Sequence, residues 1–136
     1  MEFVRHRVFS FAQESTRYCN YAKDKFGREC TFIIPSWEDY PEGGYRPTSI
    51  VDYGQFIWSL YRAEQAYFKL LDQGWIAQQA RAVLPNSLKT ELIMTGTIEQ
   101  WKDFFILRDD KQHAHPQAYE LAHPLHEEFK NRNYIQ

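Results

Sequence analysis

The sequence predicts an α+β fold in which helices pack on a small antiparallel sheet. Its 136 residues are the length of one ordinary domain, and 43% of them are hydrophobic, which is enough for a core without a metal or a disulfide. Apolar side chains recur at helical spacing over most of the second half, and shorter segments have the patterns of strands. We therefore expect a single domain over residues 1–136, with helices dominant.

Three segments are predicted to be strands. The first, Glu2–Phe9, alternates apolar and polar residues and would place Arg5 and Arg7 on one face. The second, Thr31–Ile34, is a short run of β-branched and aromatic residues that ends at a proline. The third, Leu88–Thr95, has the pattern of a buried or interface strand and ends at a glycine.

The longest predicted helix begins with Ser49 as its N-cap and runs to about Gln73, with Gly74 as its stop. Apolar side chains occupy one face and charged side chains the opposite face, which is typical of a helix packed against a core. Three further helices are predicted: 76–84, stopped before Pro85; 97–108, opened by a capping box of Thr97 and Gln100; and 117–132, which Pro124 should kink or divide.

The charge balance excludes several classes of partner. Lys and Arg number 16 against 18 Asp and Glu, which gives a net charge of −2. No global positive field attracts nucleic acid or anionic membrane, and no apolar run reaches the roughly 18 residues of a membrane span. Cys19 and Cys30, in a chain without a signal-peptide pattern, favour a reduced cytoplasmic protein. Any anion site must then be local.

The histidines have spacings that metal sites also use, at His113 and His115 and again at His123 and His126. Neither pair is accompanied by a third placed carboxylate or thiolate, so no metal site is predicted. The aromatic residues at helical spacing are assigned to the core rather than to a cofactor site: Trp101, Phe104 and Phe105.

The most concentrated signal for chemistry lies at residues 5–18. Three arginines, Arg5, Arg7 and Arg17, stand near the hydroxyl groups of Ser15 and Thr16 in a chain that is otherwise slightly acidic. Guanidinium groups offer paired donors to a phosphate, and hydroxyls can complete its shell. The segment is therefore a candidate phosphate site. The alternative interpretation is a basic strand edge that faces solvent.

The spacing of this segment as a whole is more specific than its composition. Arg-His-Arg is followed after two residues by Ser, after four more by Ser, and after one more by Arg-Tyr. This order resembles the signature of the flavin-dependent thymidylate synthases, the ThyX family. Segments 80–85, 90–91, 107–108 and 114–120 are similar to the family's downstream regions, so the resemblance covers residues 3 to about 122. The matched signature positions are Arg5, His6, Arg7, Ser10, Ser15, Arg17 and Tyr18.

The resemblance implies a ThyX-like fold and the reductive methylation of dUMP to dTMP. In such enzymes methylenetetrahydrofolate supplies the one-carbon unit, and FAD reduced by NADPH supplies the hydride. The resemblance also implies a homotetramer with shared active sites. No cysteine attacks the pyrimidine in this family, which agrees with a chain where neither Cys19 nor Cys30 has a recognisable nucleophile setting.

Carried over residue by residue, the resemblance assigns catalysis to Arg108, whose guanidinium would stabilise negative charge developing on the uracil. Taken alone, Arg108 at a helix end and Arg81 beside a short helix would have ordinary structural roles. The implied dUMP ligands are Gln13, Ser15, Thr16, Arg17, Arg81 and Arg108, and the implied FAD ligands are Arg5, His6, Arg7, Gln13, Thr97 and Asp103.

The sequence departs from the family pattern at three places. Ala12 and Gln13 stand where the motif has Asn-Glu, so one charge is lost. Thr97, Glu99 and Asp103 stand where the flavin-contacting stretch has Asn, Arg and Asn or His, and acids are unfavourable beside a pyrophosphate. The family also carries a substantial segment ahead of Arg-His-Arg. We therefore expect an N-terminally truncated relative or the C-terminal catalytic portion of a longer enzyme.

Two other functions stay open. The first is a non-catalytic nucleotide-binding relative, or an inactive fragment, that keeps the phosphate-holding arginines and has lost the flavin site. The second is a small nucleic-acid-binding module, which the balance of acidic and basic residues disfavours.

Overall fold

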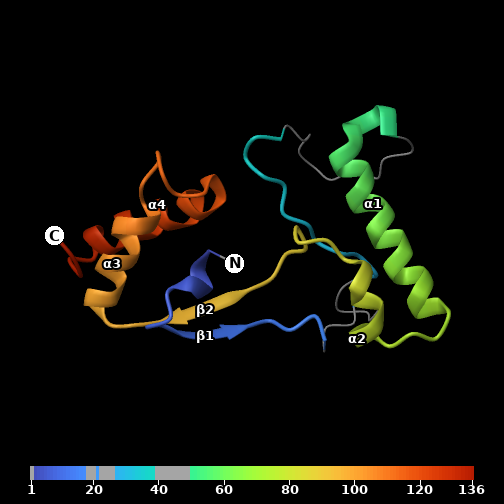
Figure 1. The fold of residues 1–136 in the computed structure, drawn as a ribbon, viewed down its shortest axis with the longest axis horizontal. Coiled ribbons are helices and arrows are strands. Elements are labelled where there is room, and N and C mark those ends of the chain that lie inside the picture. Colours follow the sequence, from blue (N-terminus) through green and yellow to red (C-terminus); the bar gives the residue numbers. More distant parts are fainter. Residues whose placement is uncertain (1, 18–20, 22–26, 39–49) are drawn as a thin grey trace. The chain divides into compact units, whose positions relative to one another are not determined.

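The computed structural model describes residues 2–17, 21, 27–38 and 50–136, and its elements confirm the predicted α+β class. The described chain divides into two compact units, one of residues 1–13 with 92–136 and the other of residues 14–91. The elements are drawn in Figure 1: η1 (Phe3–Arg5), β1 (Ser10–Gln13), α1 (Ile50–Asp72), α2 (Ala77–Ala80), η3 (Arg81–Val83), β2 (Leu92–Thr95), α3 (Ile98–Arg108) and α4 (Pro116–Asn131).

The sheet of the first unit is a two-stranded antiparallel ribbon in which Ser10 pairs with Thr95 and Gln13 with Leu92. The predicted strand over residues 2–9 is wrong, because the chain there forms the 3-10 helix η1 and a turn, and β1 begins only at Ser10. The physical reason is packing. A 3-10 turn brings residues three apart onto one side, so that Phe3 and His6 both contact the ring of Phe104, at centroid distances of 5.4 and 4.9 Å.

The predicted strand 88–95 is confirmed only over its second half, as β2. The predicted strand 31–34 is wrong, since it is reduced to a single bridge between Phe32 and Leu88. Two backbone hydrogen bonds flank this bridge, from the N–H of Ile33 to the carbonyl of Ser87 at 2.8 Å and from the N–H of Lys89 to the carbonyl of Thr31 at 2.9 Å. Beyond them, Pro35 has no N–H with which to continue the ladder.

The helices of the first unit bury its core. The predicted capping box is confirmed: Thr97 Oγ1 accepts from the N–H of Gln100 at 3.3 Å, and Gln100 Oε1 accepts from the N–H of Thr97 at 2.8 Å. The predicted last helix is α4, and Pro124 does not divide it. As predicted, the aromatic residues of α3 are core residues, in a cluster formed by Phe9, Phe104, Phe105, Ala122 and Ile135 with Trp101 packed against it.

The second unit is built on α1, which ends at Asp72 as the sequence predicts, before Gly74 with its φ of +92°. A break at Gly54, with φ +72°, interrupts its first turns. The predicted N-cap, Ser49, lies outside the described residues. The predicted helix 76–84 is present as α2 and η3 in succession. The second core cluster consists of Tyr21, Tyr67, Phe68 and Ala80. Over the described ranges, no helix has the length and apolar character to cross a membrane.

Candidate functional site

The structure places the candidate residues in both units. Seven lie in the first: Arg5, His6, Arg7, Gln13, Thr97, Asp103 and Arg108. Four lie in the second: Ser15, Thr16, Arg17 and Arg81.

In the first unit, the guanidinium of Arg108 is held by residues from the beginning of the chain. Its Nη1 donates to Oε2 of Glu2 at 2.7 Å, and its Nη2 donates to the backbone carbonyl of Glu2 at 3.2 Å. Its Nε donates to Nε2 of His6 at 2.9 Å. The Arg108 side chain is 14% exposed. A guanidinium has five N–H donors, and these bonds to the described residues use three of them. The other two N–H groups can donate to another acceptor.

The ring of His6 is held by aromatic contacts as well as by its bond to Arg108. Its ring packs on Phe104 and lies edge-on to Phe9. Burial first, and then the positive charge of Arg108, lowers the pKa of His6 below its ordinary value of 6.5, against an opposing pull from Glu2. His6 is therefore neutral at physiological pH.

The remaining candidates of the first unit are more exposed. Arg5 and Arg7 are exposed, and Gln13 is exposed at the end of β1. Thr97 uses its hydroxyl to cap α3. Glu99 pairs with Lys102 at 2.7 Å, which offsets its charge, whereas Asp103 is an exposed acid on the same helix.

In the second unit, α2 and η3 hold the segment that carries the predicted phosphate ligands. Arg81 Nη1 donates to Thr16 Oγ1 at 3.1 Å, and Arg17 Nε donates to Gln78 Oε1 at 2.8 Å. Ser15 Oγ accepts from the N–H of Arg17 at 3.3 Å. Hydrogen bonds thus join Thr16 to Arg81, Arg17 to Gln78 and Ser15 to the backbone of Arg17.

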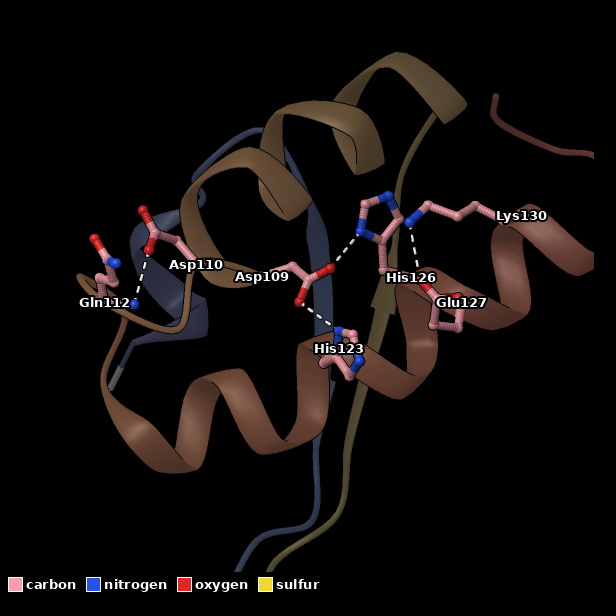
Figure 2. Close-up of polar contacts among 7 residues, drawn as sticks. All are labelled: Asp109, Asp110, Gln112, His123, His126, Glu127 and Lys130. Carbon is pink, nitrogen blue, oxygen red and sulfur yellow. Dashed lines mark hydrogen bonds and ion pairs between the residues drawn. The ribbon is translucent and has the colours of Figure 1, made fainter.

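One cluster was not expected from the sequence, and Figure 2 shows it in the first unit. The carboxylate of Asp109, directly after Arg108, accepts from Nδ1 of His123 at 2.8 Å and from Nδ1 of His126 at 2.5 Å. The prediction that no placed carboxylate accompanies this histidine pair is therefore wrong. The carboxylate was not foreseen because Asp109 follows the end of α3, whereas both histidines are on α4. Within the described ranges, no group of three or more His, Cys, Asp or Glu side chains is arranged to hold a metal ion.

Comparison with known proteins shows the family of the chain. Residues 1–132 match the family model described as thymidylate synthase complementing protein. The chain belongs to this family. It is similar to the flavin-dependent thymidylate synthases of Mycolicibacterium gilvum (34% identical over 132 residues), Mycobacterium tuberculosis H37Rv (32% over 127) and Geobacter sulfurreducens (32% over 107). These alignments cover 89%, 89% and 79% of this chain.

The same alignments cover 48%, 48% and 41% of the three relatives, so this member of the thymidylate synthase complementing family spans about half their length. The relatives' names place a flavin in their reaction. In this chain, Arg5 and Arg7 suit the phosphates of a flavin nucleotide. In the stretch from Thr97 to Asp103, the carboxylate of Asp103 does not suit a pyrophosphate, because it is an acid. The hydroxyl oxygen of Thr97 accepts a hydrogen bond in the cap of α3, and its O–H can still donate. The carboxylate of Asp103 is an acceptor, which suits a hydroxyl or a ring N–H.

The described thiol of this family member is not a nucleophile. Burial first, and then the charge of Glu64, raises the pKa of Cys30 to about 12. The carboxylate of Glu64 accepts from the backbone N–H of Cys30 at 2.8 Å and is itself buried. A thiol with so high a pKa is protonated at neutral pH and is a poor nucleophile. Cys19 lies outside the described residues.

Proposed function

We propose that this chain carries out the reductive methylation of dUMP to dTMP. The single observation that carries the proposal is the fixed and largely buried guanidinium of Arg108, held by Glu2 and His6 with donors still to offer. Membership of the thymidylate synthase complementing family supports the same assignment.

Arg108 is the proposed catalytic residue. A guanidinium stays charged throughout the physiological range, so it can stabilise negative charge as N3 of the uracil loses its proton or as C5 becomes nucleophilic. A flavin, when bound, supplies the hydride. Methylenetetrahydrofolate is the proposed one-carbon donor and NADPH the proposed reductant.

The proposed dUMP ligands at the phosphate end are Ser15, Thr16, Arg17 and Arg81, and Gln13 of the first unit is a further proposed dUMP ligand. The bonds from Arg81 to Thr16 and from Arg17 to Gln78 hold these side chains in place before a ligand arrives, which lowers the ordering cost of binding. The proposed flavin ligands are Arg5, His6, Arg7, Gln13, Thr97 and Asp103, in which the arginines take the phosphates.

The test is made on the purified full chain. We expect the absorbance bands of a bound flavin, dUMP-dependent oxidation of NADPH, and dTMP identified by mass. Arg108→Ala should abolish product formation, whereas Arg132→Ala, which removes an exposed arginine paired with Glu128, should not. A folded chain that binds neither flavin nor dUMP would contradict the proposal.

A second function is favoured by the acidic side chain of Asp103, which does not suit a pyrophosphate. It is a non-catalytic nucleotide-binding relative, or an inactive fragment, without a flavin site. Retained dUMP affinity with no flavin uptake at high FAD concentration would select it.

We also infer that both units act as one domain serving one pyrimidine, in a cytoplasmic homotetramer with shared active sites. Light scattering gives the mass of the assembly. Recovery of dUMP-dependent activity on mixing an inactive Arg108→Ala chain with an inactive Arg81→Ala chain would support shared sites, and no recovery would count against them.

A further inference from the structure

The bond between Arg108 Nε and His6 Nε2 fixes the protonation state of the imidazole. An arginine Nε is only a donor, so Nε2 of His6 must be the acceptor and carries no proton. The single ring proton of neutral His6 is then on Nδ1. His6 is consequently a donor, through Nδ1–H alone, toward any bound group.

The charged groups around this ring are few among the described residues. Arg108 approaches it from α3, and Glu2 lies ahead of η1 and opposes the effect of Arg108. Arg5 and Arg7, its neighbours in sequence, are exposed. The contacts with Phe104 and Phe9 fix the ring plane, so that Nε2 is aimed at one place.

An arginine side chain has several rotatable bonds, and its guanidinium acts on a reacting ring only when its direction is fixed. Glu2 accepts from the two terminal nitrogens of the guanidinium, and His6 accepts from Nε. The bond at Nε fixes the orientation of the guanidinium plane. We propose that His6 is a positioning residue for Arg108 and orients its guanidinium toward the substrate through the neutral Nδ1–H tautomer. This inference rests on the proposed function of Arg108.

The arrangement has a consequence for pH. A proton on Nε2 removes the acceptor and sets an imidazolium against a guanidinium, so Arg108 loses its alignment. Because the pKa of His6 is below 6.5, this happens only on the acid side of that value. The tethering by Glu2 persists there, since it does not use Nε2.

Two substitutions separate the roles of the imidazole. His6→Phe keeps a ring against Phe104 but has no acceptor, and His6→Gln loses the ring but can place an oxygen near the position of Nε2. We expect His6→Phe to lower kcat by about ten- to a hundredfold with the Kd for dUMP nearly unchanged. We expect wild-type turnover to fall on the acid side of pH 6.5, and His6→Gln to retain most of kcat without that fall. Equal kcat in His6→Phe and wild type, or an unchanged acid limb in His6→Gln, would overturn the inference.

A second measurement does not depend on turnover. The ¹⁵N spectrum of the histidine-labelled full chain reports the tautomer of His6, and we expect Nδ1–H at pH 7.5. Arg108→Ala should raise the pH at which His6 titrates, since it removes a neighbouring positive charge. An Nε2–H tautomer, or the same titration in Arg108→Ala, would refute the positioning role. A wild type with the expected spectrum but neither dUMP binding nor turnover would instead refute the proposed function.

Discussion

Asp109 and His126 join the end of α3 to the middle of α4. Nδ1 of His126 donates to the Asp109 carboxylate at 2.5 Å, and the His126 ring stacks on Phe105 with a centroid distance of 4.4 Å and an interplanar angle of 7°. The Asp109 side chain is only 10% exposed. Because Asp109 directly follows Arg108, this bond also fixes where the helix carrying Arg108 ends.

Asp109→Asn should destabilise the protein. An amide has one oxygen, so at least one imidazole N–H faces a donor and loses its partner. Loss of charge-assisted hydrogen bonds at a mostly buried site costs about 1–3 kcal/mol. Urea unfolding measures the change. Asp110→Asn is the matched control, because Asp110 bonds the exposed His113 and should change stability much less. Equal effects of the two substitutions would show that Asp109 is not a tie between helices.

The same carboxylate should make stability depend on acid pH. Burial by itself raises the pKa of Asp109, but the hydrogen bonds and charges of His126 and His123 outweigh it, so the pKa lies below its ordinary 3.8. A depressed pKa in the folded state contributes stability that is present above pH 3.8 and is lost as pH falls through the folded value.

Unfolding measured at pH 5 and pH 3 should therefore show a larger loss in the wild type than in Asp109→Asn. Parallel losses in both proteins would mean that Asp109 has an ordinary pKa in the folded state.

Local signals in the sequence were enough for the helices and not for the first strand. Thr97 and Gln100 cap each other within four residues, so the start of α3 could be predicted from the sequence. The alternation over residues 2–9 predicted a strand, yet Phe3 and His6 turn toward Phe104, about a hundred residues away. Periodicity carries no information on such a distant partner.

In the candidate site too, contacts between residues far apart in the sequence could not be predicted. The composition of residues 5–18 predicted Thr16 and Arg17 as candidate phosphate ligands, and the resemblance predicted Arg81, but the contacts of Gln78 with Arg17 and of Glu2 with Arg108 were not predicted. Glu2 meets Arg108 across 106 positions, and nothing in the sequence marks that pair. His123 and His126 were visible as a pair, whereas Asp109 was not, because its carboxylate reaches them from another helix.

The polar bonds of the second unit predict a division of labour among the arginines. Arg17→Ala should weaken dUMP binding most, and Arg108→Ala should remove turnover with a smaller change in affinity. Thr16→Val deletes only the hydroxyl that accepts from Arg81 and should weaken binding by about tenfold. Isothermal titration with dUMP measures the affinity of all three variants, and dTMP formation measures the turnover of Arg108→Ala. Equal loss of affinity in Arg17→Ala and Arg108→Ala would contradict the division.

Cys30 should be unreactive. With a pKa of about 12, almost none of the thiol is thiolate at pH 8. In a Cys19→Ser background, where Cys30 is the remaining cysteine, iodoacetamide should label the folded chain far more slowly than the urea-unfolded chain. Similar labelling rates in the two states would show that Cys30 is an accessible thiolate.

Gly96 joins β2 to α3 at a place where no side chain fits. A Cβ at this position would lie 2.6 Å from Cε1 of Phe9 and 2.9 Å from Oε1 of Gln100. Phe9 is buried, with its ring edge-on to Trp101 at 4.8 Å, so it cannot move without disturbing the core. Gly96→Ala should therefore destabilise the protein by about 1–3 kcal/mol.

The steric origin of that loss can be tested with a second substitution. Phe9→Leu shortens the side chain that the new methyl group would meet, at the cost of a cavity of its own. If the clash is the cause, the two changes together should cost less than the sum of their separate effects in thermal or urea unfolding. Strict additivity would place the effect of Gly96→Ala in the backbone instead of in contact with Phe9.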